Sequence, residues 1–198
     1  MLTGKNISFL RGGTPLFSDL SFSLNNGERL AIKGANGSGK STLLRLLTGL
    51  IPPSRDTLFW NGEMISKTTL CLYQQNLVYV GHKLCLHPEA RVRDQIQIWK
   101  NLYKIPEQDI AYALENWGIG AFNHKKIAHL SQGQQKRLSL SRCSWLDRSL
   151  WILDEPEAGL DQPGQERLLE SLSDHLKKGG IVIQATHASQ LNALEIYL

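Results

Sequence analysis

The sequence predicts an α/β fold with three parts: a parallel-sheet core, an N-terminal antiparallel β layer and an inserted α-helical subdomain. Residues 1–60 are rich in short apolar runs separated by turn residues, whereas residues 85–146 show the apolar spacing of helices. Two continuous apolar runs follow, in 149–156 and 179–187, and such runs are typical of parallel strands buried on both faces. We therefore expect one domain over residues 1–198, with residues 85–146 as the helical subdomain.

The expected β layer rests on local signals. Residues 6–10, 20–24 and 29–34 are short apolar runs, and the segment Asn-Asn-Gly at 25–27 is a turn signal between the last two. In the segment TLFWNGEMI, the pair Asn61-Gly62 favours a two-residue hairpin turn, because both residue types accept a positive φ. A β-hairpin is therefore expected around this pair.

The helical subdomain is predicted from apolar periodicity in residues 91–103 and 105–119, where Pro106 and Glu107 suit a first helical turn. A further helix is expected behind the segment LSQGQ, and another in residues 163–178, between the two continuous apolar runs. The chain thus ends in the order strand, helix, strand, which is an α/β core interrupted by a helical insert.

Composition argues against a nucleic-acid-binding protein, a membrane-spanning or secreted protein, and a protein built on disulfides or zinc. Hydrophobic residues make up 41% of the chain and charged residues 20%, and a net charge of +4 is too small to argue for nucleic acid as a partner. No apolar run approaches the ~20 residues of a membrane-spanning helix, and the N-terminus lacks a secretory signal, so we expect a cytosolic chain that could dock on a membrane protein. Cys71, Cys85 and Cys143 form no C-x-x-C pair and are expected to be small hydrophobes, in neither a disulfide nor a zinc site.

The segment GANGSGKST matches the P-loop pattern G-x-x-x-x-G-K-[ST] and stands between a predicted strand and a predicted helix. Its glycines let consecutive N–H groups turn toward an anion, and the helix N-terminus adds partial positive charge. Lys40 should reach the β- and γ-phosphates of a nucleotide, and Ser41 should ligate Mg²⁺. The expected nucleotide-binding residues are Gly34, Ala35, Asn36, Gly37, Ser38, Gly39, Lys40, Ser41 and Thr42.

A second metal-side carboxylate is expected at the end of another core strand. The segment SLWILDEP brings Asp154 and Glu155 to the C-terminal edge of its strand, where α/β proteins bind ligands. Asp154 would hold Mg²⁺ through water, and Glu155, on the other side of the strand, would polarise an attacking water. The alternative is an ordinary strand that ends in a solvated acidic turn.

The segment LSQGQQKR forms a third candidate element. Ser131 and Gln134 fit a capping box, so the simplest interpretation is a well-capped helix. The serine hydroxyl and the amide of Gly133 at a helix N-terminus would also form a second anion site.

These motifs, in this order, resemble the ATPase subunits of ABC transporters over the whole chain. The resemblance implies a P-loop NTPase fold and ATP hydrolysis with Mg²⁺, with Lys40, Glu155 and His187 as catalytic residues. It also makes 34–42 the Walker A motif, Asp154 the Walker B aspartate, 130–134 the signature and 158–161 the D-loop. In this family two subunits pack head to tail, so that Ser131, Gly133 and Gln134 of one copy close on the phosphates bound by the other.

Three features depart from the family pattern, and in one of them Gln132 stands at the usual glycine of the signature and the D-loop reads Ala-Gly-Leu-Asp. His82 stands where most relatives have a glutamine that touches Mg²⁺ and water, so it is a candidate metal-side residue, and an imidazole titrates near neutral pH. Arg11 stands where relatives stack an aromatic ring on adenine, and a guanidinium plane can also stack on a base.

The segments NLVYVGH, SLWILDEP and GGIVIQATH narrow the resemblance to the ATP-binding subunits of bacterial cytochrome c maturation complexes, which are haem exporters. This implies membrane-embedded partner subunits, a peripheral position on the cytoplasmic side of the inner membrane, and no nucleic acid. The alternatives are an ABC ATPase for another cargo such as a lipid, ion or peptide, a soluble ABC protein, and a P-loop kinase, against which LSQGQ and Glu155 argue.

Overall fold

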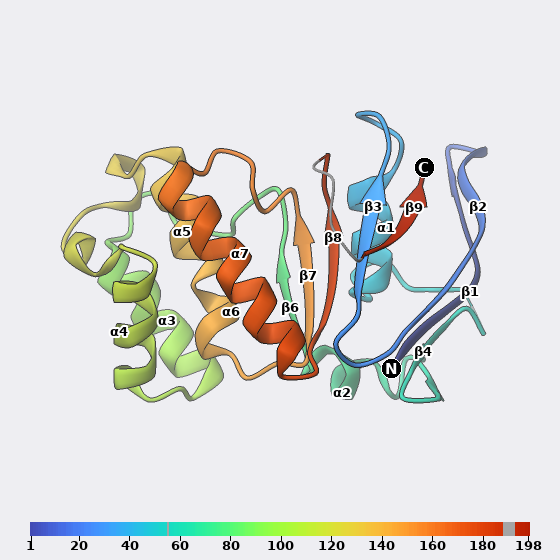
Figure 1. Cartoon of the computed structure of the whole chain (residues 1–198), viewed down its shortest axis with the longest axis horizontal. Helices are drawn as coiled ribbons and strands as arrows, with labels where there is room; N and C mark the ends of the chain where they lie inside the picture. Colours follow the sequence, from blue (N-terminus) through green and yellow to red (C-terminus); the bar gives the residue numbers. More distant parts are fainter. Residues whose placement is uncertain (55, 188–192) are drawn as a thin grey trace. The chain divides into compact units, whose positions relative to one another are not determined.

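The structure is a computed structural model that describes residues 1–54, 56–187 and 193–198. The described chain divides into two compact units (Figure 1). The first unit consists of Met1–Gly81, Arg148–Glu155 and Asp174–Leu198, and the second consists of His82–Asp147 and Pro156–Ser173.

The first unit contains an antiparallel sheet in the strand order β2-β1-β4-β5. Strand β1 (Leu2–Arg11) pairs with β2 (Thr14–Leu24), and both are longer than the apolar runs that predicted them. The predicted hairpin is confirmed: β4 (Leu58–Trp60) and β5 (Glu63–Met64) are antiparallel and joined by Asn61 at φ 50° and Gly62 at φ 83°. Both turn residues are left-handed, as the Asn-Gly signal requires.

The parallel sheet of the first unit has the order β6-β7-β8-β3-β9. Strands β7 (Leu150–Asp154) and β8 (Ile181–Ala185) are buried at every residue, which explains their uninterrupted apolar sequences. They pair with each other and with β6 (Leu77–Val80) and β3 (Arg29–Lys33). The edge strand β9 (Leu194–Tyr197) is not predicted by the sequence patterns.

One helix of the first unit covers the middle of this sheet. Helix α1 (Lys40–Leu47) packs against β7 and β8, and its leucines 43, 44, 46 and 47 are buried. A second, short helix, α2 (Leu70–Gln74), is also not predicted; its Tyr73 is buried and donates to the carbonyl of Leu47 over 2.5 Å. Both sheets and α1 share one apolar cluster, so the P-loop stands directly on the hydrophobic core of this unit.

The second unit is helical. Its elements are α3 (Val92–Tyr103), α4 (Glu107–Asn116), α5 (Gln132–Leu140), α6 (Arg142–Trp145), two short 3₁₀ turns at Gly120–Phe122 and Ile127–His129, and most of α7 (Gln162–Lys177). Aromatic rings fill its core: Trp145 contacts Trp99 and Tyr103 at centroid distances of 5.8 and 6.0 Å. Trp117 is buried and donates its indole N–H to Ser144 over 3.0 Å.

The helix predictions hold with two local differences. Pro106 is the N-cap of α4, so Glu107 opens that helix and the proline stands just before it. The helix expected behind LSQGQ is two helices, α5 and α6, which meet at Ser141. Of the three free cysteines, Cys143 is buried, whereas Cys71 and Cys85 are exposed.

None of the helices in the described ranges is both long and apolar enough to cross a bilayer.

The leucines of α1 provide a test of this packing. Leu44 is fully buried in the core cluster, so Leu44→Ala should lower the free energy of unfolding by about 2–5 kcal/mol through lost burial and a residual cavity. Leu169 lies on α7 with 57% of its surface exposed, so Leu169→Ala is the matched control and should change stability by less than about 0.5 kcal/mol. Urea unfolding followed by circular dichroism measures both, and equal losses would contradict the burial of α1 against the sheet.

Candidate nucleotide-binding site

The P-loop of the first unit has the backbone that phosphate binding needs. Gly34, Gly37 and Gly39 lie at φ 145°, 86° and 110°, a region that L side chains rarely adopt. The loop follows β3 directly, and Gly39 is the N-cap of α1, so the N-terminus of that helix faces the loop. Lys40 is only 6% exposed and its ammonium donates to the carbonyls of Gly34 and Ala35 over 2.8 and 3.1 Å. The loop and its lysine therefore form one compact element.

Strand β9 supports the base of the P-loop. The amide of Leu198 donates to the carbonyl of Lys33 over 2.9 Å, and a Cβ on Gly34 would lie 2.6 Å from the Leu198 carbonyl oxygen. Lys33 is ion-paired with Glu195 at 2.5 Å, and the hydroxyl of Tyr197 donates to Glu195 over 2.6 Å. These hydrogen bonds raise the pKa of Lys33 and lower that of Glu195. Sequence reasoning missed this support, because β9 has no distinctive apolar pattern.

The acidic pair lies at the end of β7. Asp154 is the last residue of the strand and is 3% exposed. Glu155 has already left the strand, since its φ is 46° and its amide donates to the carbonyl of Ala185 over 3.0 Å. The backbone at Glu155 is thus left-handed, a conformation that the alternation of side chains along a strand does not predict.

His187 follows β8 and lies next to Glu155. Its Nε2 is 3.6 Å from Oε1 of Glu155, and the two side chains are 59% and 30% exposed. The sequence placed these residues at the same sheet edge, and the structure brings them together there. The pair is thus solvent-accessible, beside the buried Asp154.

Oxygen donors at this edge suit Mg²⁺. This ion usually keeps several waters and takes one or two protein carboxylates together with substrate phosphates. The buried carboxylate of Asp154 and the hydroxyl of Ser41, the second residue of α1, match that demand. Among the described residues, no group of three or more His, Cys, Asp or Glu side chains lies close enough together to hold a metal ion.

The other two predicted contact residues, Arg11 and His82, are both exposed. Arg11 is exposed at the end of β1, opposite Thr14 across the β1–β2 turn, and belongs to the first unit. His82 is exposed and opens the second unit, whereas Ser41 and Asp154 belong to the first.

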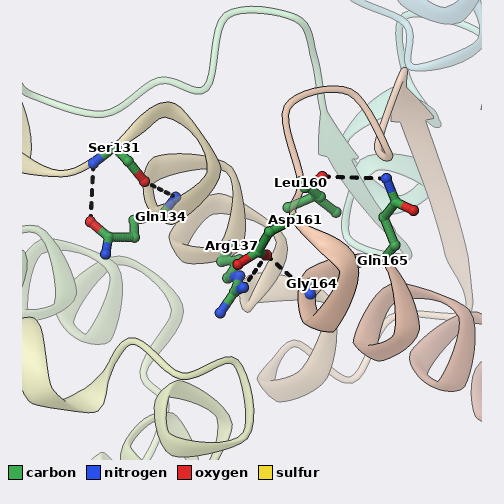
Figure 2. Close-up of polar contacts among 7 residues, drawn as sticks. All are labelled: Ser131, Gln134, Arg137, Leu160, Asp161, Gly164 and Gln165. Carbon is green, nitrogen blue, oxygen red and sulfur yellow. Dashed lines mark hydrogen bonds and ion pairs between the residues drawn. The ribbon is translucent and has the colours of Figure 1, made fainter.

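The signature segment lies in the second unit and forms the predicted capping box (Figure 2). The amide of Gln134 donates to the hydroxyl of Ser131 over 3.2 Å, and the amide of Ser131 donates to the side-chain oxygen of Gln134 over 3.0 Å. A pocket of about 540 Å³ opens beside it, lined by Gly118, Phe122, Ser131, Gln132, Gly133, Gln134, Arg137, Gly159 and Asp161.

Arg137 is a residue of this pocket that sequence reasoning missed. It forms an ion pair with Asp161, which also accepts a hydrogen bond from the amide of Gly164 over 3.2 Å. The hydrogen bond from Arg137 holds the pKa of Asp161 below its ordinary value. The residues between LSQGQ and the D-loop offered no local signal for this pairing, because it joins two segments that are distant in sequence.

Comparison with known proteins identifies the family of the chain. The ABC transporter family model matches residues 17–158, a span that includes the P-loop, the signature and the acidic pair. The chain belongs to the ABC transporter family. It is an ABC ATPase, and the fold predicted from its motifs is confirmed.

Curated relatives match nearly the whole chain. "Cytochrome c biogenesis ATP-binding export protein CcmA" of Escherichia coli (strain K12) is 39% identical over 200 residues, which cover 98% of this chain and 92% of the relative. The protein of the same name from Rhodopseudomonas palustris (strain BisB5) is 37% identical, with 94% and 92% covered. The narrower resemblance expected from the sequence is thereby confirmed.

Solved structures share the fold. The structure titled "Structure of ATP binding subunit of ABC transporter" has a TM-score of 0.81 and 25% identity, covering 94% of this chain and 80% of the other. An ATP-binding cassette described as a dimeric post-hydrolysis state bound to ADP and Pi has a TM-score of 0.82 at 21% identity, covering 100% and 94%.

The close approach of β9 to the P-loop provides a test. Gly34→Ala puts a methyl group within 2.6 Å of the Leu198 carbonyl and 2.7 Å of the Ser38 hydroxyl, so the loop must shift, and ATP affinity should fall by about tenfold or more. Gly62→Ala in the hairpin turn is the control, because its φ of 83° is equally unsuited to alanine but no atom lies within 4 Å of the new Cβ. Titration with a fluorescent ATP analogue measures both variants, and unchanged affinity in Gly34→Ala would refute the steric role of Gly34.

Proposed function

We propose that this chain is the ATP-hydrolysing subunit of an ABC transporter complex that drives haem export, or release of a haem-loaded chaperone, in cytochrome c biogenesis. The observation that supports it most is the match, at 35% to 39% identity over almost all of the chain, to proteins named for ATP-binding export in that process. The complex would include membrane-embedded subunits, with this chain bound peripherally at the cytoplasmic face of the inner membrane. The haem itself need not touch this chain.

The P-loop supplies the binding energy for the nucleotide in this proposal. Backbone amides of residues 34–42 would surround the phosphates, and the ammonium of Lys40, now bound to loop carbonyls at the same place, would transfer its hydrogen bonds to the β- and γ-phosphates. Arg11 would lie against the adenine through its guanidinium plane, which suits an exposed residue at a turn.

Glu155 and His187 would perform the proton chemistry. The Glu155 carboxylate would accept a hydrogen bond from the attacking water, and His187, 3.6 Å from it, would orient that water and donate toward the γ-phosphate. The backbone of Glu155 is left-handed and its amide donates to the carbonyl of Ala185, so the main chain that carries the proposed base is held to the end of β8. Ser41 and Asp154 would hold Mg²⁺, which neutralises charge on the phosphates when it is bound.

In this proposal the anion site of the signature binds the nucleotide held by a second copy of the chain. Ser131, Gly133 and Gln134 belong to the second unit and line a pocket there, and in a head-to-tail dimer they would close on the phosphates held by Lys40 of the partner copy. In such a two-fold symmetric dimer each copy's signature meets the other copy's P-loop, which gives two equivalent sites, and hydrolysis would let the dimer open.

Replacing the proposed base tests the assignment of function. Glu155→Gln removes the carboxylate that would accept the proton while preserving its shape, so ATP hydrolysis should fall by about 100-fold or more and the ATP-bound form should accumulate. Purification of that trapped form from membranes, followed by mass spectrometry, should recover membrane subunits of the cytochrome c maturation system. Recovery of lipid, ion or peptide transporter subunits instead, with c-type cytochromes still made in a deletion strain, would refute the haem assignment and leave the ATPase intact.

The histidine at position 82 provides a separate test. A histidine is an unusual donor toward Mg²⁺, which prefers oxygen, so the nucleotide should be held mainly by the P-loop, and His82→Gln should retain ATP binding within about threefold. Glutamine restores an oxygen donor, so hydrolysis should also persist. Equilibrium titration with an ATP analogue measures the effect, with His129→Gln, another exposed histidine of the second unit, as the control. A binding signal abolished only in His82→Gln would overturn the prediction.

A further inference from the structure

The signature helix and the D-loop are linked by side-chain and backbone contacts within the second unit. Helix α5 begins just after Ser131, and Arg137 stands six residues further on, about 9 Å along the same helix. The D-loop, residues 158–161, leads into α7, and Asp161 stands directly before its first residue. Figure 2 shows the guanidinium of Arg137 and the carboxylate of Asp161 facing each other between the two helices.

Asp161 performs two tasks with one carboxylate oxygen. Its Oδ1 pairs with Arg137 and also accepts the amide of Gly164 over 3.2 Å, which satisfies a free N–H in the first turn of α7. The carbonyl of Asp161 accepts the amide of Gln165 over 2.9 Å, and the Gln165 side chain donates to the carbonyl of Leu160 over 3.3 Å. The end of the D-loop is therefore part of the rigid start of α7.

Two glycines make room for the guanidinium. A Cβ on Gly164 would lie 2.9 Å from Nε of Arg137, and a Cβ on Gly118 would lie 3.3 Å from its Nη1. The Arg137 side chain is only 16% exposed, whereas that of Asp161 is 61% exposed. A largely desolvated arginine with a defined fork of donors fixes the direction of its partner better than a surface ion pair does.

An independent contact links the same two segments through the backbone. A Cβ on Gly133, in the signature, would lie 2.8 Å from the carbonyl oxygen of Gly159 in the D-loop. The signature and the D-loop thus touch at one end through glycine backbone and are paired at the other through Arg137 and Asp161.

We propose that Arg137 is a positioning residue that joins the signature, 131–134, and the D-loop, 158–161, into one rigid surface offered to the second copy of the chain. This rests on the proposed head-to-tail dimer. Two segments held in a fixed mutual geometry bind as a single surface, whereas unlinked segments must each be ordered when the dimer forms. Without Arg137 the P-loop, which lies in the other unit, should still bind ATP, but the dimer should close poorly.

The test uses the full chain with Arg137→Gln, Asp161→Asn and the double variant. Asparagine keeps an oxygen that can accept from the Gly164 amide, so Asp161→Asn preserves the helix cap and removes only the charge. Arg167→Gln on α7 is the matched control, since the Arg167 side chain is 42% exposed and forms a local ion pair with Glu170 at 2.9 Å. Dimer formation is measured in the Glu155→Gln background by sedimentation at increasing ATP, and hydrolysis is measured with Glu155 in place.

Each single variant should weaken ATP-dependent dimerisation and lower kcat by about tenfold, and the double variant should be no worse than either single variant. Binding of a fluorescent nucleotide at protein concentrations below dimerisation should stay within about twofold of the unmodified chain. Arg137→Lys should recover part of the lost dimerisation and kcat, because an ammonium keeps the positive charge but lacks the planar set of guanidinium donors. A residue that served only stability would instead lower nucleotide binding and the unfolding temperature together.

Failure of the positioning role can be distinguished from failure of the proposed dimer. If the Arg137 and Asp161 variants match Arg167→Gln, or if their effects add in the double variant, the positioning role is refuted while the ATPase stands. If the unmodified chain and Glu155→Gln form no ATP-dependent dimer at any concentration, the head-to-tail arrangement itself fails, and the inference fails with it.

Discussion

The site depends on one steric constraint, the close approach of backbone to backbone at Gly34. The carbonyl of Leu198, the residue after β9, lies 2.6 Å from where a Cβ would be, so the chain can approach the loop this closely only because residue 34 has no side chain. That contact, with the pairing of β9 to β3, closes the edge of the parallel sheet beneath the loop. The P-loop is therefore held from one side by the buried helix α1 and from the other by an edge strand.

The buried strands explain why the acidic pair lies where it does. Strands β7 and β8 are buried along their whole length, so their register is fixed by the core on both faces. Their ends consequently deliver Asp154 and His187 to defined positions, and the hydrogen bond from Glu155 to Ala185 ties the two strand ends together. The left-handed conformation of Glu155 is the local strain that this arrangement requires.

Much of this architecture could be predicted from the sequence, since strong local signals coincide with the elements that matter most. Asn61-Gly62, the uninterrupted apolar runs of β7 and β8, and the P-loop spacing each act within a few residues, and each is observed. Strand β9 could not be predicted, because it is an edge strand whose residues are mostly exposed and whose stability comes from pairing with β3. The conformation of Glu155 was missed for a related reason, because alternation along a strand says nothing of where the strand ends.

The pairing of Arg137 with Asp161 shows what kind of information a single sequence lacks. Neither residue is unusual where it stands: an arginine in a helix is ordinary, and an aspartate before a helix is a common cap. Their connection follows only from the fold of the second unit, where Gly118 and Gly164 leave space for the guanidinium and α7 presents the carboxylate. Because the cap and the ion pair share one oxygen, rotating Asp161 to break either would disturb both. A motif defined by a few consecutive residues can thus depend for its geometry on a partner that lies outside the motif.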